Sequence, residues 1–93
     1  MTEQSLIVEA LSGKDVVVDT NSRFVYIGRL ASANEQFLEL RDVDVHDCGD
    51  SNTPKEIYVI DARKYGIKRN RESVFVMARQ VISISPLEGI IEY

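Results

Sequence analysis

The stretch that decides the fold is DVVVDTNSRFVYIGRL, residues 15–30. Its first segment, 15–19, has three central valines and is too short for a helix, and Thr20-Asn21-Ser22 has the composition of a turn. Residues 23–30 again favour a strand, with Gly28 at a position where a side chain would block a sharp bend or a close neighbour. The sequence therefore predicts a β-hairpin.

Three further strands are expected after this hairpin. Leu38 and Leu40 alternate with polar residues, and this period of two indicates a sheet with one face in water. Closer to the C-terminus, two β-branched runs are separated by Ala78-Arg79-Gln80 and closed by Pro86. The expected strands are 15–19, 23–30, 36–45, 74–77 and 81–84, with polar loops at 31–35 and 46–53.

A helix is predicted over residues 3–11. The apolar residues Leu6, Ile7, Ala10 and Leu11 are spaced so that they share one face of such a helix. The sequence therefore predicts a short amphipathic helix with one apolar face.

The segment 54–65 is ambiguous by local pattern. Ile57-Tyr58-Val59-Ile60 has strand propensity, whereas Thr53, Pro54 and Gly66 supply an N-cap, a first-turn proline and a C-cap. The interval between these two terminal signals suits a helix better than a strand. We therefore favour an inserted helix at about 54–65.

One helix, five strands and an inserted helix in 93 residues favour a mainly β protein with a single domain, residues 1–93. The strands are expected to form a strongly bent antiparallel sheet, a small open barrel. A flat sheet of this size would leave one face without cover.

The composition excludes several classes of protein. Apolar residues make up 44% and charged residues 28%, ordinary values for a folded chain, and no apolar run approaches the roughly 18 residues that cross a membrane. The N-terminus lacks the basic start of a secretory signal, so a cytoplasmic location without a membrane partner is expected. Cys48 is the one cysteine, so no intrachain disulfide can form, and the net charge of -4 opposes long-range attraction to nucleic acid.

The order of these elements resembles a known family. A helix, Val16-Val17-Val18-Asp19, a turn, residues 24–30, a loop and then Phe37-Leu38-Glu39-Leu40 are similar to the first signature of the Sm and Sm-like (LSm) proteins. Residues 74–86 are similar to the last two strands of that family. The resemblance identifies the chain as a noncanonical Sm-like protein.

The resemblance covers about residues 5–45 and 72–86 and leaves 46–71 as an enlarged connection between strands three and four. It implies a homo-oligomeric ring in which strands four and five pair between subunits. The residues at those pairing edges would be Val74, Phe75, Val76, Met77, Ile82 and Ile84.

The resemblance also implies single-stranded, often uridine-rich RNA at the pore of the ring. In that family an aspartate, an aromatic residue and an asparagine follow strand two, and an arginine-glycine pair follows strand four. Here Asn34 stands near the aspartate, Phe37 near the aromatic residue and Glu39 near the asparagine, while Met77-Ala78 replaces arginine-glycine. Glutamate cannot donate to a uracil carbonyl and methionine has no charge, so these positions oppose the usual RNA site. Phe37 is either a stacking platform or, more commonly for such a residue, part of the core.

A basic segment offers a different RNA surface. Its cationic residues are Arg63, Lys64, Lys68, Arg69 and Arg71. They either bind phosphate or, as such runs more often do, form the solvated end of a helix whose dipole they complement. Tyr65 beside them either stacks on a base or packs back onto the sheet.

The acidic stretch 42–50 raises the question of a metal or catalytic site. It contains Asp42, Asp44, His46, Asp47, Cys48 and Asp50, all side chains that can ligate metals. However, His46 and Cys48 have no partner pair elsewhere, and aspartates around a glycine are typical of turns. No third group is evident to orient His46 as a base. We expect no metal or other cofactor, no catalytic residues and no enzymatic activity.

Two functions remain open. The first is an Sm-like, ring-forming binding or scaffold module that contacts RNA through a noncanonical surface. The second is a protein-protein interaction or assembly module with no nucleic-acid role, whose inserted helix docks a protein partner. The basic segment favours the first function, whereas the net charge, Glu39 and Met77 favour the second.

Overall fold

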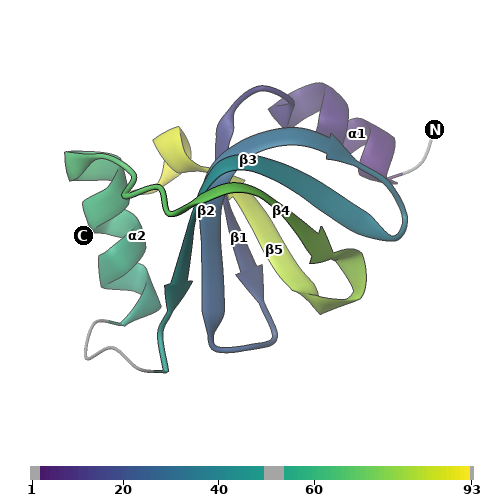
Figure 1. Cartoon of the computed structure of the whole chain (residues 1–93). Helices are drawn as coiled ribbons and strands as arrows, with labels where there is room; N and C mark the ends of the chain where they lie inside the picture. Colours follow the sequence, from purple (N-terminus) through teal and green to yellow (C-terminus); the bar gives the residue numbers. More distant parts are fainter. Residues whose placement is uncertain (1–2, 50–53, 93) are drawn as a thin grey trace.

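A computed structural model of the protein describes residues 3–49 and 54–92. Within these residues, the strands are β1 (Asp15–Thr20), β2 (Phe24–Ala33), β3 (Phe37–Asp47), β4 (Arg71–Met77) and β5 (Val81–Pro86). Helix α1 (Glu3–Leu11) precedes the sheet and helix α2 (Lys55–Tyr65) lies between β3 and β4; the two helices are on opposite sides of the molecule (Figure 1). The short 3-10 turns η1 (Ala78–Gln80) and η2 (Leu87–Gly89) follow β4 and β5.

The five strands form one antiparallel sheet in the order β4-β3-β2-β1-β5. β4 and β5 are joined only by the three residues of η1, yet they are the two outermost strands. The sheet therefore has to bend strongly so that its two edges approach each other (Figure 1). This confirms the predicted fold, which is mainly β with an N-terminal helix and a bent five-stranded antiparallel sheet.

The structure corrects three predicted boundaries: β2 continues through the expected loop 31–35 as far as Ala33, β3 continues beyond 45 to Asp47 and includes His46, and β4 begins at Arg71 rather than at 74. These segments are paired with their neighbours: Ala33 with Leu38, Asp47 with Phe24, and Arg71 with Val43. The length of a strand is set by its backbone pairing. One face of an antiparallel sheet can be exposed to water, so polar side chains on that face do not indicate a loop.

Helix α2 confirms the helix favoured over 54–65. Pro54 occupies its N-cap position, and Gly66 follows its last residue with a φ of 101°, a conformation that favours glycine. The backbone N–H of Gly66 donates to the carbonyl oxygen of Ala62 at 3.0 Å, which closes the last turn. Thr53, the predicted N-cap, lies outside the described residues.

Helix α1 uses less of its predicted apolar face than the spacing suggests. Leu11 packs against the core, but Leu6 is 55% exposed and Ala10 is also exposed. The side chain of Ile7 lies outside the described residues. No helix in the described ranges is long and apolar enough to cross a lipid bilayer.

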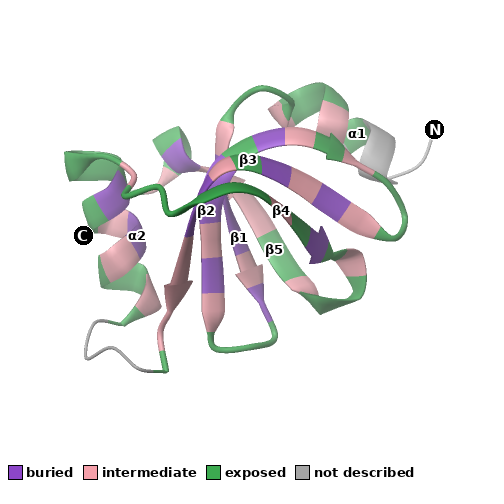
Figure 2. Ribbon diagram, viewed as in Figure 1, coloured by how far each residue is buried: buried purple, intermediate pink, exposed green. Residues whose placement is uncertain are grey.

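Buried side chains gather on both faces of the sheet (Figure 2). The inner core, on the concave side, consists of Val16, Val18, Leu30, Leu38, Leu40, Val43 and Val76. The outer core, which lies between the sheet and helix α2, consists of Val17, Val25, Ile27, Val59, Ala62 and Leu87. β1 is buried on both faces, and this explains why its three valines do not alternate with polar residues.

The close approach of the paired strands β2 and β3 at the bend of the sheet involves Gly28 and Asp42. A Cβ atom at Gly28 would lie 3.1 Å from the carbonyl oxygen of Arg41 and 3.1 Å from the Cα atom of Val43. The β2–β3 register shifts at this glycine, and Asp42 has a φ of 52°. Its carboxylate is held by the Arg29 guanidinium at 2.8 Å. The missing side chain at Gly28 therefore lets the two strands approach where the sheet bends.

Candidate functional site

Three apolar side chains meet on the outer face of the sheet where β3 begins and β4 ends. This Phe37 cluster consists of Phe37, Phe75 and Met77. Phe37 lies opposite Met77 in the strand register, and its ring meets the Phe75 ring edge to face with centroids 5.1 Å apart. Phe75 is 53% exposed and Met77 is also exposed. The cluster thus presents an aromatic and thioether surface to solvent, of the kind on which a base can stack.

Asn34 shapes the turn that carries Phe37. Its side-chain oxygen accepts hydrogen bonds from the backbone N–H groups of Gln36 at 2.8 Å and Phe37 at 2.9 Å. The N–H of Ala78 donates to the carbonyl oxygen of Gln36 at 2.8 Å, which ties this turn to η1. The structure therefore brings Asn34 and Phe37 together with Met77 at one end of β3 and β4.

Glu39 lies beside this cluster, and its negative charge is paired with a cation of the same strand. Its carboxylate accepts from the Arg41 guanidinium at 2.8 Å and from the Ser32 hydroxyl at 3.0 Å, and these bonds hold the pKa of Glu39 below its usual value. Arg41 is a cation that the sequence reasoning missed. The sequence does contain a signal for this pair: Glu39 and Arg41 are two residues apart on a predicted strand, so their side chains lie on the same face.

The basic segment lies elsewhere. Arg71 pairs with Val43 at one end of β4, whereas Met77 pairs with Phe37 at the other. β4 has seven residues, so these ends are about 20 Å apart at roughly 3.3 Å per residue. The residues predicted to bind RNA therefore form two separate surfaces rather than one site.

Most cations of the basic segment bind acceptors of the chain itself. Lys64 pairs with Glu92 at 3.2 Å, which raises the pKa of Lys64. The remaining contacts are Arg63 with the Glu88 carbonyl at 3.3 Å, Arg69 with Asp15 at 3.4 Å and with the Asp42 carbonyl, and Arg71 with the Asn70 carbonyl at 2.9 Å. Tyr65 is 76% exposed, so it does not pack back onto the sheet. These contacts support the reading of this segment as a solvated surface.

Asp44 and His46, considered above as metal ligands, help to fix α2 on the sheet. Asp44 is 2% exposed and accepts hydrogen bonds from the Tyr58 hydroxyl and, at 3.3 Å, from the Asn70 side-chain amide. The Tyr58 ring stacks on His46 with centroids 3.5 Å apart. Burial and the bond to Asp44 raise the pKa of Tyr58 above its usual value. The sequence reasoning missed this contact because the partners come from separate elements.

Two further acidic residues of the stretch 42–50, Asp42 and Asp47, also have structural contacts. Asp42 pairs with Arg29, and Asp47 pairs with Arg23 at 3.1 Å and accepts from the Gly49 N–H at 2.9 Å. Asp50 lies outside the described residues. Within 3–49 and 54–92, no group of three or more His, Cys, Asp or Glu side chains is placed to hold a metal ion.

Cys48 is half-buried against the outer core, and this burial raises the pKa of its thiol. We expect iodoacetamide at pH 7.5 to alkylate Cys48 several-fold more slowly than it alkylates the thiol of free glutathione. Only the thiolate reacts, and a raised pKa leaves less of Cys48 in that form. Mass spectrometry over a time course measures the rate. Urea-unfolded protein is the control and should react like a simple thiol. Equal rates in folded and unfolded protein would contradict the raised pKa.

The outermost strands differ in how they expose their side chains. Val76 is buried, and Val74 and Ile84 pack against the inner core. The side chains of these three predicted edge residues therefore point inward. Phe75 and Met77 point outward from β4, and Ile82 of β5 is 66% exposed. Within the described ranges, no strand pairs with the outer side of β4 or of β5.

Solved structures provide a comparison for this arrangement. The chain is similar to an Sm protein from Pyrococcus abyssii, whose structure is in complex with a uridine heptamer, with 17% identity over 91% of this chain and 99% of that one and a TM-score of 0.62. It is also similar to an Sm-like protein from Archaeoglobus fulgidus, with 15% identity over 92% and 96% of the two chains and a TM-score of 0.60. Neither models of protein families nor curated protein sequences match the chain. The bent five-stranded sheet with its N-terminal helix is therefore the Sm-like fold.

Proposed function

We propose that this protein is a self-associating Sm-like module, in which β4 of one copy pairs with β5 of the next. The observation that carries the proposal is that, among the described residues, no strand covers the outer edge of β4 or of β5, and Phe75 and Met77 are exposed on one strand and Ile82 on the other. Such edges are hazards unless another strand or a cover satisfies them. Because the two edges differ, the contact is head to tail and gives a ring when its rotation closes.

The proposed module is noncanonical in the region between β3 and β4. The connection between these strands, residues 48–70, is enlarged and includes α2, and the family's asparagine and arginine-glycine positions are replaced by Glu39 and Met77-Ala78. A functional role without catalysis fits this picture, because the carboxylates of Asp42, Asp44 and Asp47 are engaged in structural contacts.

Self-association has a direct test in light scattering. We expect the wild-type mass at tens of micromolar to be a multiple of 10.5 kDa, and Ile82→Glu to reduce it by placing a charge at the open edge. Leu6→Glu is the matched control, because Leu6 is also an exposed aliphatic residue but lies on α1, outside the proposed edge. A wild-type monomer would contradict the proposal, as would an Ile82→Glu mass equal to that of the wild type.

We further propose that single-stranded RNA binds to this module weakly and mainly through phosphate contacts. The exposed cations of residues 63–71 support this, and the RNA-bound Pyrococcus abyssii protein of the same fold supports an RNA partner. The internal contacts of Arg63, Lys64, Arg69 and Arg71 reduce the charge available to phosphate. We therefore expect low affinity and little preference between uridine and adenosine.

Filter binding with oligo-uridine and oligo-adenosine tests the RNA proposal. Affinity should fall about tenfold or more between 50 and 200 mM salt if roughly three phosphates are contacted. Lys68→Glu with Arg71→Glu should abolish binding, and these positions avoid Arg69, which bonds to the Asp42 carbonyl. Phe37→Ala is the control and should leave the affinity unchanged.

Two other outcomes would change this assignment. Uridine-selective binding lost in Phe37→Ala would move the RNA site to the Phe37 cluster, where bases would stack. No binding at any salt would favour the alternative function, an assembly module with a protein partner. The exposed Ile57 of α2 is the structural feature that favours that alternative.

A further inference from the structure

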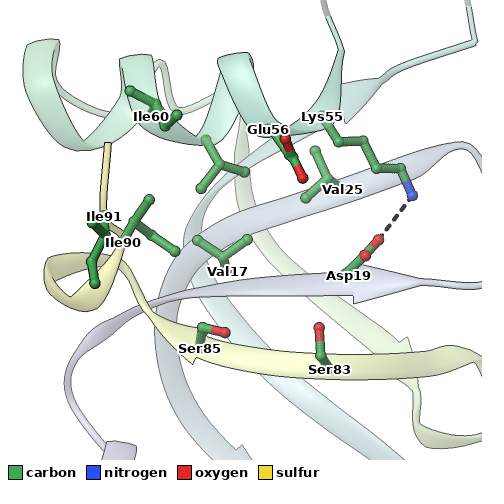
Figure 3. A pocket seen from close by; sticks show the side chains of 11 residues that line it. Val17, Asp19, Val25, Lys55, Glu56, Ile60, Ser83, Ser85, Ile90 and Ile91 are labelled. Atoms are coloured by element: carbon green, nitrogen blue, oxygen red, sulfur yellow. Dashed lines mark hydrogen bonds and ion pairs between the residues drawn. The ribbon is translucent and has the colours of Figure 1, made fainter. Parts of the chain in front are cut away.

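A cleft of about 390 Å³ opens on the outer face between α2, β5 and the C-terminal segment (Figure 3). Ser83 and Ser85 of β5 lie along the side nearest the sheet edge (Figure 3). The apolar lining comes from Val17, Val25, Val59, Ile60, Ile90 and Ile91. The cleft is thus bounded on one side by an open strand edge.

Of the three charged side chains that line the cleft, Lys55 and Asp19 pair with each other, and Glu56 is an exposed residue of α2. Lys55 pairs with Asp19 at 2.8 Å, as Figure 3 shows, and also donates to the carbonyl oxygen of Ser22 at 3.0 Å. β5, Val81–Pro86, contains no charged residue. An apolar side chain entering from the β5 edge would first meet the two small hydroxyl groups of β5 and then the aliphatic walls, with the Lys55–Asp19 pair and the exposed Glu56 also in the lining.

Strand alternation determines which side chains a β4 strand placed beside β5 would present to this cleft. Ser85 pairs with Val17 of the outer core and Ser83 pairs with Asp19, so both serines lie on the outer face. Phe75 and Met77 lie on the outer face of β4, because Val76 between them points into the inner core. A sheet that continues from one copy to the next keeps its faces continuous. Phe75 and Met77 of the second copy would then lie beside the serines.

We infer that this cleft receives the Phe75 and Met77 side chains of a second copy of the chain. The inference rests on the proposed self-association and adds α2 and the C-terminal segment to the interface. The two strand segments can pair without burying a charge, because Val74–Met77 and Val81–Pro86 are both free of charged residues. One contact removes the exposed Phe75, Met77 and Ile91 side chains from water.

Disulfide cross-linking tests the placement of Phe75. In a Cys48→Ala background, the double variant Phe75→Cys, Ile60→Cys should form intermolecular disulfides under mild oxidation, seen on non-reducing gels. The matched control is Phe75→Cys, Asp61→Cys, because Asp61 adjoins Ile60 but lines a different cleft with His46. We expect cross-linking at least tenfold faster with Ile60→Cys. Equal or absent cross-linking in the two variants would overturn the inference.

A second variant keeps the test independent of folding defects. Ile91→Asp changes a mostly exposed side chain, so the monomer should fold normally, as circular dichroism can verify. We expect this variant to have a lower mass by light scattering than the wild type at equal concentration. An unchanged mass would overturn the inference.

The results also separate this inference from the proposed function. A wild-type protein that is monomeric would overturn both. A wild-type oligomer that Ile82→Glu dissociates, but that neither cross-links through Phe75 and Ile60 nor responds to Ile91→Asp, would overturn the role of the cleft alone. Strand pairing would then occur without the contribution of α2.

Discussion

Replacing Gly28 by alanine is expected to lower the free energy of unfolding by about 1–3 kcal/mol, and replacing it by valine should cost more. The added Cβ would lie 3.1 Å from the Arg41 carbonyl oxygen and from the Val43 Cα atom. These are backbone atoms, so no rotamer change can relieve the contact, and β2 and β3 would have to separate at the bend. Urea denaturation followed by circular dichroism measures the loss.

Two controls identify the cause of this loss. Gly13 has a φ of 80° and an added Cβ there would have no neighbour within 4 Å, so Gly13→Ala reports the conformational cost alone, about 1 kcal/mol. The Gly28 methyl would also lie 3.1 Å from Cγ2 of Val43, so Gly28→Ala should cost less in a Val43→Ala background. A Gly28→Ala protein as stable as the wild type would show that the strands are not in close contact here.

Replacing Tyr58 by phenylalanine is expected to cost about 1–3 kcal/mol of stability at pH 7. The hydroxyl of Tyr58 donates to Asp44, whose carboxylate is almost fully buried, and Asn70 supplies the second donor. Without the hydroxyl, this buried carboxylate loses a partner that water cannot fully replace. Tyr65→Phe is the matched control, since Tyr65 is mostly exposed and its loss should stay within about 0.5 kcal/mol.

The same hydroxyl predicts an alkaline dependence. Burial and the Asp44 bond raise the pKa of Tyr58 in the folded protein, so the folded state keeps this proton at a pH where the unfolded state has lost it. The stabilisation is complete below about pH 10, the ordinary tyrosine pKa, and falls above it by at most about 1.4 kcal/mol per pH unit. The difference in stability between wild type and Tyr58→Phe should therefore shrink between pH 9 and 11. A constant difference would contradict the raised pKa.

The order of strands and helices could be predicted because each element is marked locally. Three consecutive valines indicate the strand at residues 15–19, and Pro54 with Gly66 indicates α2 against the strand propensity of 57–60. Strand ends were less predictable, because His46 and Arg71 are polar residues that the neighbouring strand nonetheless pairs.

The contacts at the candidate sites could not be predicted, because they join residues that are distant in sequence. Phe37 meets Phe75, and Asp44 meets Tyr58 and Asn70, only after the sheet has formed its register. The basic segment illustrates the same limit. A run of cations gives a local charge, whereas the partners that neutralise much of it, such as Asp15 and Glu92, depend on the tertiary fold.

The position of β5 beside β1 also constrains the order in which the protein can fold. Val17 pairs with Ser85, so a hairpin formed early by β1 and β2 must keep one edge of β1 open until β5 is available. During synthesis, that edge stays unsatisfied until residue 86 has left the ribosome, and the high sequence separation of the pair slows the final step. Completion of the sheet is therefore a late, long-range event, and the nascent chain is most prone to aggregation just before it.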